Sequence, residues 1–190
     1  MEVDVMIEHR RKAAKPLLWV AMVSMVMLFA GLTSGYVVRR AEGNWLEFDL
    51  PITFTYATIV LLLSSLTMAM ASISARKSSY HGVSLYLSLT LVLGLAFAAL
   101  QWKSWGTLVD GGVYFTGPGS NAAGSFFYVI TLAHLVHLIG GLLVLFFMLF
   151  RSFKRAYDAQ NLLGLQLGST FWHFLDILWV YLFLFLLFIR

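Results

Sequence analysis

Two pairs of polar residues lie inside long apolar segments of this 190-residue sequence: His134 with His137, and His173 with Asp176. The members of each pair are three residues apart, so on a helix each pair lies on one face. Imidazoles can carry protons or bind metals, and a carboxylate among apolar residues is costly unless it has a partner or a role. These four residues are our candidates for structural, subunit-contact or proton-handling positions.

The composition identifies the surroundings of these residues. The chain is 60% hydrophobic and only 12% charged, whereas soluble domains are about 45–50% apolar and about 25% charged. A soluble globule could not hide this much apolar surface, so a membrane protein is predicted. The sequence has no cysteine, which excludes disulfides, thiolate metal sites, iron–sulfur clusters and thiol catalysis.

The apolar segments predict one all-α membrane domain over residues 1–190, a polytopic bundle of five transmembrane helices. Each segment reaches the roughly 20 residues that a helix needs to cross a bilayer, and continuous apolar runs are compatible only with helices there. The predicted spans are 17–38, 51–75, 81–102, 124–150 and 170–189, after a cytoplasmic tail at 1–16.

The basic residues predict the orientation. Nine of the thirteen lysines and arginines fall in the tail and in the connections at 76–80 and 151–169, and the other four fall on the opposite side. The positive-inside rule then places the N-terminus inside and the C-terminus outside. The net charge of +4 is explained by this topology, so we expect no nucleic-acid partner.

Two interpretations of His173 and Asp176 stay open. They could handle protons or contact another subunit near the inner surface, or they could be a buried polar contact that holds helices together. We prefer the second, since intramembrane polar groups often join helices. For His134 and His137 we likewise prefer interhelical hydrogen bonds.

A bis-histidine haem requires two histidines on opposite sides at one depth, which His134 and His137 of one helix cannot provide. At 1.5 Å per residue, His137 lies about 20 Å from the inner end of its predicted span and His173 about 5 Å, which argues against that pair. His81 and His173 match in depth, so one haem arrangement stays open. Two histidines alone leave a metal shell incomplete. We predict no catalytic, metal-binding or cofactor-binding residue in this chain.

Helix packing is indicated by small residues and hydroxyls. The hydroxyls of Ser64, Ser65 and Thr67 are expected to bond back to their own helix. Small residues that allow close helix approach occur in three places: Gly31 with Gly35, Gly94 with Ala98, and Gly140 with Gly141.

The last predicted span begins Phe171-Trp172-His173-Phe174-Leu175-Asp176-Ile177-Leu178-Trp179. This run closely resembles the signature of subunit III of the haem–copper oxidases (cytochrome c oxidases), in which aromatic-Trp-His-Phe-x-Asp-x-x-Trp opens the final helix. Three further stretches look like family segments in the same order: Leu50-Pro51 with Ser64-Ser65 and Thr67; Leu93-Gly94 with Phe97 and Gln101; and Gly124-Ser125-Phe126-Phe127 with Thr131, His134 and His137.

Two positions depart from the family pattern. Met25 follows Ser24 where the family usually has Ser-Glu, and Ser104 stands where a Glu usually follows Gln101 by three residues. Roles of those carboxylates in proton or lipid contact therefore do not transfer. The five spans match the short form of the family, which lacks the first two helices of the seven-helix form.

The resemblance implies a non-redox accessory subunit of a proton-pumping cytochrome c oxidase. Haems and copper would belong to subunits I and II, with subunit I as the main contact. Other small oxidase subunits, phospholipids and a respiratory supercomplex are the further partners, in a bacterial inner membrane. The alternatives are subunit III of a quinol oxidase, a small transporter, or a haem-b membrane anchor.

Overall fold

Five helices make up the chain in the computed structural model, which describes residues 2–155, 157 and 162–189, with side chains from residue 13 onward. Their bounds are α1 Glu2–Ala41, α2 Ile52–Arg76, α3 Tyr80–Asp110, α4 Ala122–Phe153 and α5 Leu163–Phe188. The described residues contain no strand. All five helices are long and apolar enough to cross a membrane, which confirms the predicted fold class.

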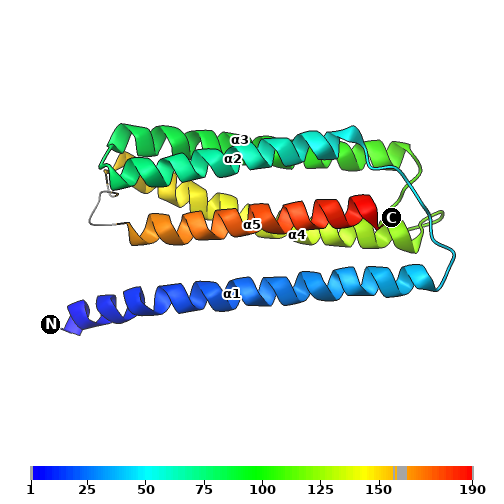
Figure 1. Ribbon diagram of the computed structural model, residues 1–190, viewed down its shortest axis with the longest axis horizontal. Helices are drawn as coiled ribbons and strands as arrows, with labels where there is room; N and C mark the ends of the chain where they lie inside the picture. The colour runs from blue at the N-terminus through cyan, green and yellow to red at the C-terminus, as the bar shows by residue number, and fades with distance from the viewer. Residues whose placement is uncertain (1, 156, 158–161, 190) are drawn as a thin grey trace.

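Helices α2 to α5 form a closed four-helix bundle, and α1 lies outside it. Around the bundle, α2 contacts α3, α3 contacts α4, α4 contacts α5 and α5 contacts α2. Helix α1 packs only against α4 and α5 and is separated from α2 and α3 by them (Figure 1). Short connections make sequential helices antiparallel, so the start of α1 and the end of α5 lie at opposite ends of the molecule (Figure 1).

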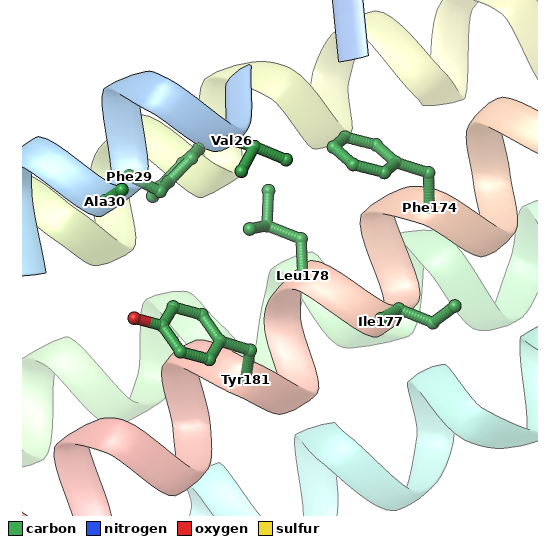
Figure 2. Close-up of a pocket in the computed structure, with 7 residues that line it drawn as sticks. All are labelled: Val26, Phe29, Ala30, Phe174, Ile177, Leu178 and Tyr181. Atoms are coloured by element: carbon green, nitrogen blue, oxygen red, sulfur yellow. The ribbon is translucent and has the colours of Figure 1, made fainter. Parts of the chain in front are cut away.

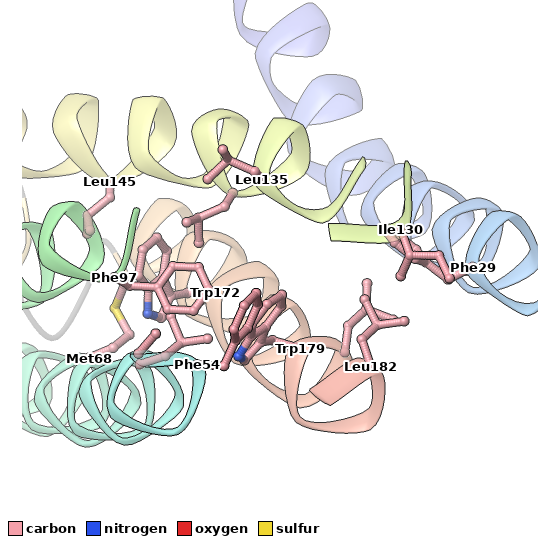
Figure 3. Close-up of a cluster of buried hydrophobic side chains, with 14 of the residues drawn as sticks. Phe29, Phe54, Met68, Phe97, Ile130, Leu135, Leu145, Trp172, Trp179 and Leu182 are labelled. Atoms are coloured by element: carbon pink, nitrogen blue, oxygen red, sulfur yellow. The ribbon is translucent and has the colours of Figure 1, made fainter. Parts of the chain in front are cut away.

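Aromatic side chains fill the centre of the bundle (Figure 3). The Trp179 ring lies edge-on to Phe97, with centroids 5.0 Å apart, and stacks on Phe54 at 6.3 Å. Trp172 and Trp179 are both fully buried. Lipid tails are as apolar as these side chains, so close packing and hydrogen bonds, not exclusion from water, must hold the bundle together.

Two glycines let the Trp172 layer form. A Cβ added at Gly94 would lie 2.8 Å from the Trp172 indole, and one at Gly141 would lie 2.8 Å from Leu175. The predicted close approach is therefore confirmed at these two positions. A Cβ at Gly31 or Gly140 would meet no atom within 4 Å, so the same spacing has no packing function there.

Three helices extend by seven residues or more beyond their predicted bounds, and α4 by two or three residues at each end. Helix α1 begins at Glu2, not at residue 17, because Ala13, Ala14 and the neighbouring charged residues favour helix and Pro16 is accommodated inside it. Helix α3 continues past Trp102 to Asp110, because the first strong stop is the pair Gly111 and Gly112. Gly112 has φ +83°, a conformation that ends a helix.

Helix α5 begins at Leu163, seven residues before the predicted start at 170. The segment it adds carries the buried Leu165 and Gly168, so it has an apolar face that packs as the rest of the helix does. Asp158 and Arg190, which entered the predicted charge distribution, lie outside the described residues.

Candidate functional site

The motif at the start of the last predicted span hydrogen-bonds to α2. The Trp179 Nε1 donates to Thr58 Oγ1 at 3.0 Å, and the Trp172 Nε1 donates to Ser64 Oγ at 3.1 Å. Both hydroxyls also donate to carbonyls of their own helix, at 2.9 Å and 2.7 Å. Each one therefore satisfies a local carbonyl and accepts an indole N–H from α5.

His173 and Ser169 continue this contact along the same pair of helices. The Ser65 hydroxyl and His173 Nδ1 are 2.7 Å apart, and Ser72 Oγ donates to Ser169 Oγ at 3.2 Å. We call these four interhelical hydrogen bonds the α2–α5 row. The expectation that Ser64 bonds its own helix is confirmed, but its bond to α5 was missed. The available signal was the recurrence of hydroxyl residues along one face of α2, since Thr58, Ser65 and Ser72 lie seven residues apart.

Asp176 lies buried inside the bundle. It is 3% exposed, and neither carboxyl oxygen has a hydrogen-bond partner among the residues with described side chains. His173, on the preceding turn, bonds Ser65 and not Asp176. Because α5 begins at Leu163, His173 is about 15 Å and Asp176 about 20 Å from that end of the helix. The predicted distance of about 5 Å between His173 and the inner end of its helix is therefore wrong.

His134 occupies an aromatic enclosure at the centre of the molecule. Its ring centroid lies 4.9 Å from that of Trp179, 6.2 Å from Phe97 and 6.4 Å from Phe29. The side chain is fully buried, and neither ring nitrogen has a partner in the described part of the chain. The expected interhelical hydrogen bond is therefore not the contact that His134 makes: its neighbours are rings of α1, α3 and α5.

His137 is half-buried and faces α1. Its Nδ1 lies 2.7 Å from the Ala133 carbonyl of its own helix, and its ring centroid lies 5.6 Å from that of Phe29. The hydrogen bond that the Nδ1 of His137 makes is therefore within its own helix and not the predicted interhelical one. The two histidines do share the face that meets Phe29, as their spacing predicted.

The sequence left open a haem held by His81 and His173. This arrangement conflicts with the positions of the two histidines along the bundle. Thr67 of α2 and Thr90 of α3 hydrogen-bond at 2.8 Å. His173 bonds Ser65, two residues before Thr67. His173 is therefore level with about residue 92 of α3, about eleven residues or 16 Å along the bundle from His81. The predicted match in depth is wrong, because α5 begins earlier than expected.

The depth argument against a His137–His173 pair is also wrong. Gly141 faces Trp172 and Leu175, which places His137 and His173 within about one helical turn of the same level. They differ instead in direction: His137 faces Phe29 on α1 and His173 faces Ser65 on α2. In the described part of the chain, no group of three or more His, Cys, Asp or Glu could hold a metal ion, which is consistent with a chain that carries no cofactor.

The two positions that lack a family carboxylate have packing roles. Met25 lines an apolar cavity of about 390 Å³ between α1, α4 and α5, with Val144 and Phe171 on the opposite walls. Ser104 donates to Thr53 of α2 at 2.6 Å. Thus a thioether and a hydroxyl contact neighbouring helices where the sequence comparison expected charge.

A second apolar cavity, of about 260 Å³, lies between α1 and α5 (Figure 2). Val26, Phe29 and Ala30 of α1 line one side, and Phe174 and Tyr181 of α5 lie opposite (Figure 2). Together with the cavity beside Met25, it leaves α1 flanked by open apolar space on both sides of its contact with the bundle.

Comparison with known proteins gives a consistent result along the chain. The family model described as "Cytochrome c oxidase subunit III" matches residues 46–189, the part that contains α2 to α5. A relative from Nocardia farcinica, named "Probable cytochrome c oxidase subunit 3", is 35% identical over 180 residues, which is 92% of this chain and 86% of the relative.

Two further relatives are named as subunits of two different kinds of oxidase. One from Mycobacterium tuberculosis, also named "Probable cytochrome c oxidase subunit 3", is 33% identical over 172 residues, 88% of this chain and 83% of its own length. One from Pseudomonas aeruginosa, named "Cytochrome bo(3) ubiquinol oxidase subunit 3", is 31% identical over 170 residues, 87% of this chain and 79% of its own length.

Proposed function

Since the chain belongs to the cytochrome c oxidase subunit III family, we propose that it is the accessory subunit III of a haem–copper oxidase that takes electrons from cytochrome c. The enzyme is a terminal oxidase, in which oxygen reduction is coupled to proton translocation. This chain has no catalytic centre of its own. It stabilises the haem–copper subunit and binds lipids.

The observation that carries this proposal is how the α5 motif is used. Trp172, His173 and Trp179 form the α2–α5 row with hydroxyls of α2. These three side chains, which could have served redox chemistry, therefore hold two helices together. This use supports a structural role within a larger enzyme.

Contact with the partner subunits is assigned to the surface of the bundle. Of the four candidate residues, His137 and His173 are half-buried. His137 packs against Phe29 of α1, whereas the Nδ1 of His173 is used by Ser65. This leaves Nε2 for a group outside the chain. Asp176 and His134 are buried inside the bundle, so their role is internal. Subunit I is the main partner, and subunit II, other small subunits and a respiratory supercomplex are further ones.

The relatives support our proposal for the membrane and the electron donor. Their organisms are bacterial, which supports the bacterial inner membrane, and the distribution of lysine and arginine supports an N-terminus inside. The relatives named for cytochrome c oxidase are 29% to 35% identical, and the ubiquinol oxidase subunit, at 31%, is not better than these. The description of the family model and the names of the first relatives favour cytochrome c as the donor of the whole complex, with a quinol as the alternative.

The test is purification of the complex through a tag on this chain. We expect a haem–copper subunit to copurify, and the complex to oxidise reduced cytochrome c faster than quinol. The chain separated from its partners should show no Soret absorbance. A stoichiometric Soret band on the separated chain would overturn the accessory role.

A pair of histidine variants tests the assigned contact. His173→Leu should lower the amount of haem–copper subunit recovered, because it removes the half-buried imidazole at the bundle surface. His81→Leu, at an exposed position at the start of α3, is the matched control and should leave recovery unchanged. Equal recovery from both variants would remove His173 from the contact.

A further inference from the structure

A polar cavity of about 170 Å³ lies where the end of α2 meets the beginning of α5. Polar groups of both helices line it: Ser72 and Arg76 from α2, and Gln166, Ser169 and Thr170 from α5. The Ser72–Ser169 hydrogen bond, the last of the α2–α5 row, forms its inner wall. The two cavities beside α1 are lined mainly by apolar side chains, so the cavity between α2 and α5 differs from them in chemistry.

Arg76 is the only charged residue among those lining the cavity, and it is exposed. It forms no ion pair with any residue whose side chain is described. A guanidinium offers five N–H donors that match the oxygens of a phosphate. Donors from Gln166 and Thr170 lie around the same space, so the cavity presents several hydrogen-bond donors and one positive charge.

The same end of the molecule is rich in positive charge, and we call it the basic end. Arg151, Lys154 and Arg155 lie over aromatic rings there, at 6.0, 4.7 and 5.9 Å from the ring centroids. Burial raises the pKa of the Tyr157 phenol above its usual value, although Arg151 opposes this. Tyr157 therefore stays neutral, and it does not offset the positive charge of its neighbours.

Apolar surface continues from the cavity along α2 towards the middle of the membrane. Leu66, Met70 and Ile73 of α2 are exposed, as is Ile177 of α5. A ligand that fills the cavity and covers this surface needs a polar, anionic head and an apolar tail. Basic clusters beside membrane spans attract anionic lipids, at about 1 kcal/mol for each Lys or Arg near the surface.

We propose that the cavity between α2 and α5 binds the phosphate of an anionic phospholipid, with Arg76 as the principal contact and the acyl chains along α2. This inference deepens the lipid binding in the proposed function and rests on it. A free phosphate ion has no tail to cover Leu66, Met70 and Ile73, so the apolar surface favours the lipid. The head lies at the basic end, where the bundle meets water.

The experiment uses the complex purified through this chain and stripped of loosely bound lipid with detergent. Phosphatidylglycerol is then titrated in, and native mass spectrometry counts the lipids that stay on this subunit when it is released. Arg76→Gln should weaken binding of one phosphatidylglycerol about fivefold or more. Lys77→Gln removes a neighbouring charge that does not line the cavity, and it should change binding less than twofold.

Two further arms define the ligand. Arg76→Lys keeps the charge without the planar guanidinium, and it should retain binding between that of the wild type and that of Arg76→Gln. Phosphatidylcholine should bind more weakly than phosphatidylglycerol, and inorganic phosphate should not displace the lipid at equal concentration. Displacement by inorganic phosphate, or equal losses from Arg76→Gln and Lys77→Gln, would overturn the proposal.

Subunit content separates this inference from the proposed function. If Arg76→Gln keeps this chain in the complex and loses the lipid, the inference holds. If the variant releases the chain from the complex with its lipid still bound, Arg76 contacts a partner protein and the inference is overturned. If the wild-type chain recovers no haem–copper subunit at all, it is the proposed function that fails.

Discussion

The bundle of α2 to α5 and the outer helix α1 cross the same membrane but are held in different ways. Of the membrane-spanning window, 39% is buried in α2, α4 and α5 and 28% in α3, against 17% in α1. Hydrogen bonds between side chains link α2 to both of its neighbours and α3 to α4. Among described side chains, α1 has one such link to the bundle, Thr33 with Tyr181 at 3.2 Å.

This difference shows what an apolar sequence needs in order to form a specific membrane structure. Hydrophobicity places all five helices in the bilayer but does not choose their neighbours, since lipid is as apolar as leucine. Neighbours are chosen by hydroxyl–indole pairs and by glycines that admit a ring. Helix α1 has few of either, and the family model begins at residue 46, after α1 has ended.

The largest expected effect is all-or-none and tests whether both regions cross the membrane as described. Glu42 follows α1 and Lys77 follows α2, at opposite ends of a 25-residue helix. Single cysteines at Glu42 and Lys77 should react with a membrane-impermeant maleimide from opposite sides, Lys77 from the inside. The native chain has no cysteine, so the background is clean. Labelling of both from one side would contradict the five-span topology.

The next effect compares one tryptophan from each region. Trp172 is 1% exposed in the bundle, whereas Trp19 of α1 is 62% exposed. Trp172→Ala should lower the free energy of unfolding by about 3–5 kcal/mol, the usual loss for a buried aromatic ring. Trp19→Ala should change it by less than about 0.5 kcal/mol. Unfolding of the reconstituted chain in a denaturing detergent measures both, and equal losses would remove the contrast.

A smaller effect is expected from adding atoms. Gly94→Val forces its side chain against Trp172 and Leu142, and overpacking of this kind typically costs about 1–3 kcal/mol. Gly31→Val in α1 meets open space and is the matched control. The same unfolding assay applies. An equal or larger loss from Gly31→Val would contradict the difference in packing between the two glycines.

The smallest effect concerns the polar link of α1. Tyr181→Phe removes one partner of the hydrogen bond to Thr33, and such interhelical bonds average about 0.6 kcal/mol. The weaker contact should let α1 move relative to α5, which is measured as a faster change in crosslinking between cysteines placed on the two helices. Unfolding of the bundle should be unchanged. Thr58→Val in α2 breaks the bond to Trp179 and should affect the bundle instead.

The number, type and approximate place of the helices could be predicted from the sequence, because five apolar runs dominate it. The ends of α1, α3 and α5 could not, since helices continue into polar segments wherever no strong stop intervenes. Gly112 marks the end of α3, but nothing between 163 and 170 signals that α5 has already begun. The depth of His173 and both haem arguments depended on that boundary and failed with it.

The site was predicted in part for a related reason. Helical spacing places His134 and His137 on one face, and the structure agrees. Spacing within one helix cannot say what a neighbouring helix offers, so the expected partners of these histidines were wrong. The hydroxyls at positions 58, 65 and 72 could have indicated that this face of α2 meets another helix. They could not have given the pairing, since Trp172 bonds Ser64 and His173 bonds Ser65.

The closed ring of contacts in the bundle has a consequence for how the protein is made. Helix α5 is the last of the five to be synthesised, yet it supplies the tryptophans that touch α2, α3 and α4. Until α5 is inserted, Gly94 and Gly141 border an unfilled space and the hydroxyls of α2 lack their indole partners. Long-range contacts of this kind form late and leave earlier segments exposed to wrong partners. Completion of α5 therefore acts as the point at which a nascent chain becomes a stable subunit or a substrate for membrane proteases.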